Sequence, residues 1–277
     1  ASGRAPEEVA DNVTKFMEQG YRHVRIQQGG YGGGDSLDKK PDFREAGFGG
    51  QTDAFMDQHA YLKSVPKMFD VVRKRCGEDV ELLHDVHERV EPIEVINMIR
   101  HVEPYRPFFI EDPFSPENME WFKQLRMSTS TPIAMGELFN NINEFKLPMI
   151  NQWFDYIRIH VSQIGGITPA MKVARLGEWF NIKTAWHGPG DVSPVGHAAH
   201  AHIDLAIWNF GIQEAGRFSD KLQEVFKGCP TMKNGYMSVN EAPGLGVDIN
   251  EKEAAKYPIT TKSNWQVRKN DGTIIRP

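Results

Sequence analysis

The sequence predicts an α/β fold in which parallel strands alternate with helices to form a (β/α) barrel. Short apolar runs alternate along the chain with stretches of helical periodicity, a pattern typical of βα units and a parallel sheet. The chain has 277 residues, 40% of them hydrophobic and 25% charged, which is enough for the single large core of such a barrel. Several apolar runs end on an acidic residue, and the catalytic groups of barrels lie at the carboxyl ends of the strands.

The helices are predicted from apolar residues that recur at helical spacing. In the first, Val9, Val13, Phe16 and Met17 follow this spacing, and Gly20 marks the end. The predicted helices occupy residues 6–20, 60–77, 92–105, 117–129, 143–153, 168–180 and 195–207.

The strands are predicted from the short β-rich runs between these helices. They occupy residues 23–27, 80–85, 108–113, 132–137, 155–161, 182–188 and 209–214. These are seven strands, one fewer than the eight of a closed barrel. The Gly-rich residues 29–53 lack periodicity and are predicted to form a long loop, a kind of segment that is usually functional or mobile.

Composition and charge exclude several classes of function. The formal net charge is −5 and no basic patch stands out, so we expect no nucleic-acid partner. The two cysteines, Cys76 and Cys229, are too few for a disulfide framework and are not spaced for zinc. They suit a reducing compartment, and we expect a cytoplasmic location. No apolar run is as long as the roughly 18 residues that a membrane span requires, and no membrane partner is expected.

Three acidic residues end consecutive predicted strands at equal intervals. Asp85, Glu111 and Glu137 follow one another in two steps of 26 residues. Equivalent positions on consecutive barrel strands face the same mouth, and carboxylates that close together require a cation. An all-carboxylate set suits Mg²⁺. The alternative is that each acid caps the helix after its strand, but the repeated interval on apolar strands favours the metal site.

These motifs resemble the enolase superfamily and, more narrowly, its mannonate dehydratase branch, which includes starvation-sensing-like proteins. The resemblance rests on "DVH", "IEDP" and "GE" at their 26-residue steps and on the later phrases "DYIRIHVSQIGGITPAMKVA", "WHGPGDVSPVGHAAHAHIDLAIWNFGIQE" and "PGLGVDINE". Related branches carry Lys-x-Lys at the end of the second barrel strand, where this chain has Arg25-Ile26-Gln27. That departure argues against a racemase-like activity.

The resemblance also implies a domain organisation. The family has an N-terminal capping domain and a first barrel strand, which we expect upstream of Ala1. Residues 1–225 are expected to form the barrel domain with strands two to eight, and residues 226–277 a C-terminal segment that packs back on it. An open sheet edge invites aggregation, so residues 1–277 expressed alone are expected to fold poorly.

The activity that the resemblance implies is the Mg²⁺-dependent removal of water from a sugar acid to give a 2-keto-3-deoxy acid. Mg²⁺ stabilises the enediolate formed when the α-proton leaves, a base removes that proton, and an acid protonates the departing hydroxyl. His87 is the expected acid, or else a histidine satisfied by nearby backbone. Tyr31, with the field of Arg25 lowering its pKa from about 10, is the expected base, or else an ordinary loop aromatic.

Five further residues are expected to bind the substrate. Arg158, at a strand end, can clamp a carboxylate through two hydrogen bonds, and His187 can act as a donor or second acid/base group. Asp191 and Glu214 can accept from sugar hydroxyls, or cap loops. Trp265 is expected to reach over the pocket, or to have a core or interface role.

A histidine cluster, His197, His200 and His202, resembles a metal set at first sight. Only His197 and His200 share a helical face, and no acid or Cys completes the set. The cluster is therefore predicted to be structural.

Three functions remain open from the sequence. The first is dehydration of D-mannonate to 2-keto-3-deoxy-D-gluconate by a homo-oligomeric hydro-lyase. The second is the same chemistry on D-gluconate or another acid sugar. The third is a protein that binds a sugar acid in a regulatory role with low activity.

Overall fold

The computed structural model describes residues 1–29, 54–190, 192–214, 216–258, 267–269 and 273–275. The chain divides into two compact units, residues 1–133 with 263–277 and residues 134–262. The predicted loop at residues 29–53 lies, apart from Gly29, outside the described residues.

The barrel strands of the first unit are parallel, as predicted. They are β2 (His23–Arg25), β5 (Glu81–Asp85) and β6 (Phe109–Glu111). Strand β5 pairs with β2 on one side and with β6 on the other. The chain then continues from β2 into β3 (Gln27–Gln28), which pairs in parallel with β1 (Ser2–Gly3) at the N-terminus.

The helices of the first unit cover these strands with apolar faces. They are α1 (Pro6–Glu18), α2 (Gln58–Cys76), α3 (Pro92–Val102) and α4 (Met119–Ser128), with the short 3₁₀ helices η1 (Glu103–Tyr105) and η2 (Pro116–Asn118). Val9 and Val13 of α1 and Met68 and Phe69 of α2 are fully buried, in keeping with the predicted helical spacing. The Asp57 carboxylate caps α2 by accepting from Ala60 N at 3.0 Å.

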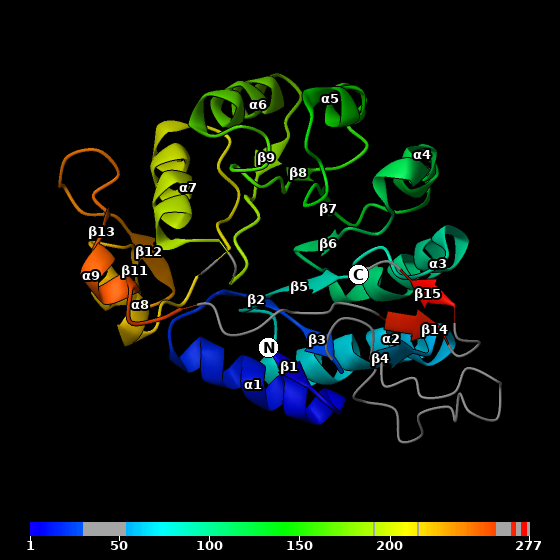
Figure 1. Ribbon diagram of the computed structural model, residues 1–277. Helices are drawn as coiled ribbons and strands as arrows, with labels where there is room; N and C mark the ends of the chain where they lie inside the picture. Colours follow the sequence, from blue (N-terminus) through cyan, green and yellow to red (C-terminus); the bar gives the residue numbers. More distant parts are fainter. Residues whose placement is uncertain (30–53, 191, 215, 259–266, 270–272, 276–277) are drawn as a thin grey trace. The chain divides into compact units, whose positions relative to one another are not determined.

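The second unit repeats the strand–helix alternation. Its parallel strands are β7 (Ile133–Met135, which begins at the last residue of the first unit), β8 (Tyr156–Ile157) and β9 (Lys183–Thr184). The helices between and after them are α5 (Ile142–Ile150), α6 (Ile167–Trp179) and α7 (Pro194–Ala206). Helices α5 and α6 lie along strands β8 and β9 (Figure 1). Polar residues follow the carboxyl ends of these strands, among them Glu137 after β7, Arg158 and His160 after β8, and His187 after β9.

The end of the second unit consists of short elements. They are α8 (Asp220–Val225), β10 (Phe226–Lys227), β11 (Thr231–Lys233), β12 (Tyr236–Ser238), β13 (Asp248–Ile249) and α9 (Glu251–Ala254). Strands β10 and β13 form one antiparallel pair, and β11 and β12 form another.

The predicted strand at residues 209–214 is wrong as a regular strand. The structure has a single parallel bridge there, between Thr184 and Phe210. Gly211 N and Ile212 N both donate to the Thr184 carbonyl, at 3.0 and 3.2 Å. Because two successive N–H groups share one acceptor, the regular hydrogen-bond pattern of a parallel strand pair does not form. Gly211 lies so close to its neighbours that a Cβ would come within 2.7 Å of the Thr184 carbonyl oxygen and the Tyr156 ring. Only glycine permits this approach.

The first unit also contains a small three-stranded sheet. Strands β14 (Val267–Lys269) and β15 (Ile274–Ile275) join β4 (Ala54–Met56) in the order β15-β14-β4, all within the first unit. None of the helices in the described part of the chain combines the length and the hydrophobicity that a membrane span requires.

Candidate active site

Two of the predicted metal ligands lie side by side in the first unit. The register of β5 and β6 pairs Asp85 directly with Glu111, as their equal positions on consecutive strands predict. Both residues are buried, with exposed fractions of 2% and 1%. Asp112, which is fully buried, completes a group in which the carboxylate oxygens of all three residues lie within 4.8 Å of one another. The sequence analysis missed Asp112, although its signal is plain: a second acid directly after Glu111.

Arg25 supplies the positive charge beside these carboxylates. Its Nη1 atom lies 3.5 Å from Asp85 Oδ2 and 3.7 Å from Glu111 Oε2. Arg25 ends β2, the strand next to β5, so its side chain extends across the tips of both acidic strands. Arg25, the predicted partner of the base Tyr31, thus lies beside two of the predicted metal ligands, Asp85 and Glu111.

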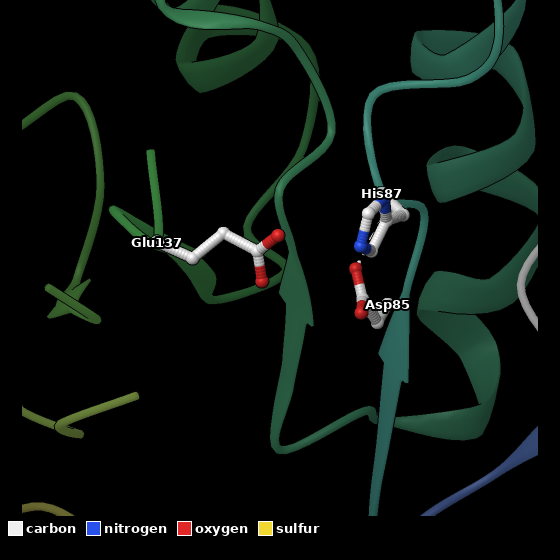
Figure 2. Close-up of side chains that lie close together, drawn as sticks. All are labelled: Asp85, His87 and Glu137. Carbon is white, nitrogen blue, oxygen red and sulfur yellow. Dashed lines mark hydrogen bonds between the residues drawn. The ribbon is translucent and has the colours of Figure 1, made fainter. Parts of the chain in front are cut away.

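A backbone N–H of the turn after β5 holds the side chain of Asp85 in place. His87 N donates to Asp85 Oδ1 at 2.8 Å, as Figure 2 shows. His87 and Glu88 have φ angles of 55° and 59°, a left-handed conformation that is uncommon for residues other than glycine. The tight turn brings the His87 side chain, 9% exposed, back beside the strand tip.

Hydrogen bonds of three polar residues, Gln27, His84 and Tyr61, stabilise the end of β5. Gln27 Nε2 donates to the Asp85 carbonyl at 2.9 Å, which gives a role to the position where related branches have a lysine. His84 contacts the Ile26 carbonyl at 2.8 Å through Nδ1 and the Tyr61 hydroxyl at 2.7 Å through Nε2. Burial lowers the pKa of His84 to about 4, so the ring is neutral and adds no charge next to Asp85.

Ion pairs connect four predicted site residues of the second unit: Glu137, Arg158, His187 and Glu214. His187 Nε2 lies 3.0 Å from Glu137 Oε2 and 4.0 Å from Glu214 Oε2. The turn before Glu137 contains Gly136 at φ 145°, where a Cβ would come 3.0 Å from the Arg158 backbone. Glycine therefore lets the end of β7 approach the end of β8.

The Arg158 guanidinium donates hydrogen bonds to two other residues of the second unit. Its Nη2 atom donates to Glu214 Oε2 at 2.9 Å and its Nη1 atom to the Ala185 carbonyl at 3.1 Å. Gly188 N donates to the same Glu214 oxygen at 2.8 Å. Glu214 Oε2 thus accepts hydrogen bonds from both Arg158 and Gly188 at the edge of the group.

The histidine cluster of α7 fits the predicted structural role. His197 and His200 are 0% and 1% exposed, and burial lowers the pKa of His197 and brings that of His200 to about 3. Both rings are therefore neutral near pH 7. No group of potential metal ligands among the described residues includes either of them.

Three predicted site residues lie outside the described residues. They are Tyr31, Asp191 and Trp265.

The residues that are described fit Mg²⁺ by the chemistry of their donors. Asp85, Glu111 and Asp112 offer only carboxylate oxygens, all buried, and hard oxygen ligands are those that Mg²⁺ prefers. Buried carboxylates this close together also need a cation to remain ionised.

Comparisons with known proteins identify the family of this chain. Residues 8–253 match the family model described as "Enolase C-terminal domain-like". The D-galactonate dehydratase family member RspA of Pantoea ananatis is 47% identical over 289 residues, which cover 98% of this chain and 68% of that protein. A D-galactonate dehydratase family member of Enterocloster bolteae is 42% identical and is matched over 100% of this chain and 69% of its own length.

Solved structures show the same fold. An enolase from Pantoea ananatis, crystallised with D-gluconate and Mg, superposes with a TM-score of 0.95 at 46% identity, over 100% of this chain and 70% of that chain. A mandelate racemase/muconate lactonizing enzyme from Jannaschia sp. CCS1 superposes with a TM-score of 0.79 at 23% identity, over 94% of this chain and 62% of that chain. The latter shows the fold alone.

These findings confirm the predicted barrel fold, the predicted class of enzyme and the predicted cofactor, Mg²⁺. The relatives are named for D-galactonate dehydratases and not specifically for mannonate dehydratases, so the choice of D-mannonate stays a prediction. The chain belongs to the enolase superfamily and, within it, to the D-galactonate dehydratase family, a family of hydro-lyases.

Proposed function

We propose that this protein dehydrates a sugar acid with the help of Mg²⁺, and that D-mannonate, converted to 2-keto-3-deoxy-D-gluconate, is its first-choice substrate. The observation that carries the proposal is the pairing of the buried Asp85 and Glu111 carboxylates at adjacent strand ends, with Arg25 beside them. A structural core gains nothing from two buried acids at this place, whereas a metal-dependent dehydratase requires them.

Asp85, Glu111 and Glu137 are the proposed metal ligands. The support is their repeated 26-residue interval at the ends of consecutive strands and the all-oxygen character of the set. When bound, Mg²⁺ supplies positive charge that makes the α-proton of a substrate carboxylate easier to remove.

The chain's own residues are proposed to move the protons. Tyr31 takes the α-proton, and the Arg25 guanidinium favours the phenolate form that this requires. His87, carried by the turn directly after Asp85, gives a proton to the departing hydroxyl. The His87 backbone bond to Asp85 supports this assignment, because it ties the acid to the metal ligand.

The remaining predicted residues are proposed to bind the sugar acid. Arg158 and His187 offer donors to its oxygens, and Asp191, Glu214 and Trp265 are proposed to contact its hydroxyls and cover it. The ion pair between Arg158 and Glu214 supports a common role in substrate binding, since each side chain fixes the position of the other.

A second candidate substrate is D-gluconate. The specific observation in its favour is the D-gluconate bound in the Pantoea ananatis enolase, which is 46% identical to this chain. The homo-oligomeric state and the cytoplasmic location expected from the sequence remain predictions.

A panel of sugar acids tests the proposal. Full-length protein with Mg²⁺ would be incubated with D-mannonate, D-gluconate and D-galactonate, and formation of the 2-keto-3-deoxy product would be followed. Turnover of D-mannonate well above the others is the expected result, and preferred turnover of D-gluconate would select the second candidate. Saturable binding of a sugar acid without measurable product would indicate the regulatory role instead.

A further inference from the structure

Two histidine rings of the second unit form a short contact. His187 Nδ1 lies 2.6 Å from His160 Nε2, and the ring planes are perpendicular, with centroids 4.3 Å apart. Each residue is 8% exposed. A contact this short between two ring nitrogens requires a proton between them, because two lone pairs repel.

The backbone brings the two rings together. His160 follows β8, and His187 follows β9, the strand paired with it in parallel. Beyond the strand ends, Ala185 N donates to the Ile157 carbonyl at 3.0 Å and His187 N to the Ile159 carbonyl at 3.2 Å. These bonds hold the two loops in register, so the ring contact follows from the sheet.

The opposite edge of the His187 ring determines where its proton lies. Nε2 faces two carboxylate oxygens, Glu137 Oε2 at 3.0 Å and Glu214 Oε2 at 4.0 Å. An ionised carboxylate only accepts hydrogen bonds, so Nε2 must carry a hydrogen. In a neutral His187 ring Nδ1 is then an acceptor, and the proton in the short contact belongs to His160 Nε2.

We propose that His160 is a positioning residue, which holds His187 as the tautomer with its proton on Nε2. The tautomer of a histidine is set by the hydrogen bond that its other nitrogen makes. With the Nε2–H direction fixed, His187 presents a donor to a substrate oxygen without first reorienting its ring. The effect on turnover rests on the proposed function, whereas the tautomer itself does not.

Nitrogen NMR of the full-length protein tests the tautomer directly. Proton–nitrogen correlation spectra of ¹⁵N-histidine-labelled protein distinguish protonated from unprotonated ring nitrogens, and the variants His187→Gln and His160→Gln assign the signals. The expected result is a protonated Nε2 and an unprotonated Nδ1 on His187, with a protonated Nε2 on His160. A His187 ring with its proton on Nδ1, or protonated on both nitrogens, would overturn the proposal.

Two variants separate positioning from simple packing. His160→Gln retains an amide N–H near the position of Nε2, whereas His160→Phe fills a similar volume without a donor. We expect His160→Phe to lose the single His187 tautomer and to lower kcat by roughly 10–100-fold, the range typical of lost supporting bonds, with KM little changed. His160→Gln should restore most of both. Equal loss of kcat in the two variants, or an unchanged His187 spectrum in His160→Phe, would contradict the proposal.

The tautomer of His187 can be decided even if the His160→Phe variant does not fold or the protein turns over no sugar acid. If His160→Phe does not fold, the spectrum of the parent protein still decides the tautomer. If no sugar acid is turned over, the proposed function fails while the NMR result stands by itself.

Discussion

Arg25 and Asp85 form an ion pair at the tips of neighbouring strands, with Arg25 Nη1 at 3.5 Å from Asp85 Oδ2. The same guanidinium lies 3.7 Å from Glu111. Arg25 therefore lies beside two of the proposed metal ligands. Its positive charge favours the ionised form of both carboxylates and would repel a divalent ion bound by them.

Replacing this charge should change metal affinity. Arg25→Met removes a like charge beside the proposed metal site, so we expect Mg²⁺ to bind severalfold more tightly. Turnover should fall, because Arg25 is the proposed source of the positive field that ionises Tyr31. Isothermal calorimetry with Mg²⁺ measures the affinity. Arg25→Lys, which keeps the charge, is the control and should stay near the parent. Weaker binding in Arg25→Met would show that Arg25 holds the ligands in place more than it repels the ion.

The metal requirement is tested by removal of the ion and of one ligand. Chelation should abolish turnover, and added Mg²⁺ should restore it. Asp85→Asn should weaken Mg²⁺ binding by at least tenfold, or about 1.4 kcal/mol, because a neutral amide replaces a charged oxygen ligand. Glu241→Gln, which changes an exposed acid of the second unit, serves as the control. Unchanged Mg²⁺ affinity in Asp85→Asn would remove this residue from the ligand set.

The acid and the base can be separated by mutation. His87→Asn should lower dehydration by roughly 10²–10⁴-fold, as expected for a lost general acid, while the α-hydrogen of the substrate still exchanges with D₂O. Tyr31→Phe should lose both reactions, because no anion forms. NMR of the substrate in D₂O measures both. Exchange that survives in Tyr31→Phe and disappears in His87→Asn would reverse the two assignments.

The buried His200 predicts a stability that falls in acid. Burial lowers its pKa to about 3 from an ordinary value near 6.5. Between these values the unfolded chain takes up a proton that the folded chain does not, so the free energy of unfolding decreases as pH falls from 6.5 towards 3, by up to about 1.4 kcal/mol per unit. Above pH 6.5 this residue contributes no pH dependence.

Urea unfolding at a series of pH values measures this slope, and His200→Gln should make it shallower. The partly buried Asp204 acts in the opposite direction, because desolvation raises its pKa to about 8 and stability then falls as pH rises towards that value. The difference between the parent and His200→Gln isolates the histidine. Parallel curves for the two proteins would contradict the expectation.

Gly211 should not tolerate a side chain. In Gly211→Ala the new Cβ would meet the Thr184 carbonyl oxygen and the Tyr156 ring at 2.7 Å, and we expect a loss of about 1–3 kcal/mol in the free energy of unfolding. Gly190→Ala is the matched control, since no heavy atom lies within 4 Å of its Cβ position, and it should stay within about 0.5 kcal/mol. Urea denaturation measures the free energy of unfolding of both variants. Equal values for Gly211→Ala and Gly190→Ala would show that the backbone at Gly211 can move away from Thr184 and Tyr156 without cost.

The alternation of strands and helices and the position of the acids could be predicted from the sequence. Apolar spacing identified α1, and the equal interval between Asp85 and Glu111 predicted that they would meet, because parallel strands in register bring equivalent positions to one edge. The pairing of these residues in β5 and β6 is what that reasoning requires. The same reasoning failed at residues 209–214, since local apolar character does not reveal that Gly211 is pressed against the Thr184 carbonyl.

Other features of the site were decided only by the tertiary structure. The bond from Gln27 to the Asp85 carbonyl joins residues far apart in the chain, and the turn at His87 and Glu88 is left-handed without a glycine to announce it. The contact between His160 and His187 likewise depends on how β8 and β9 pair. A sequence determines which residues reach a strand end through local periodicity, whereas the atoms they meet there depend on strand register and backbone turns set by the whole fold.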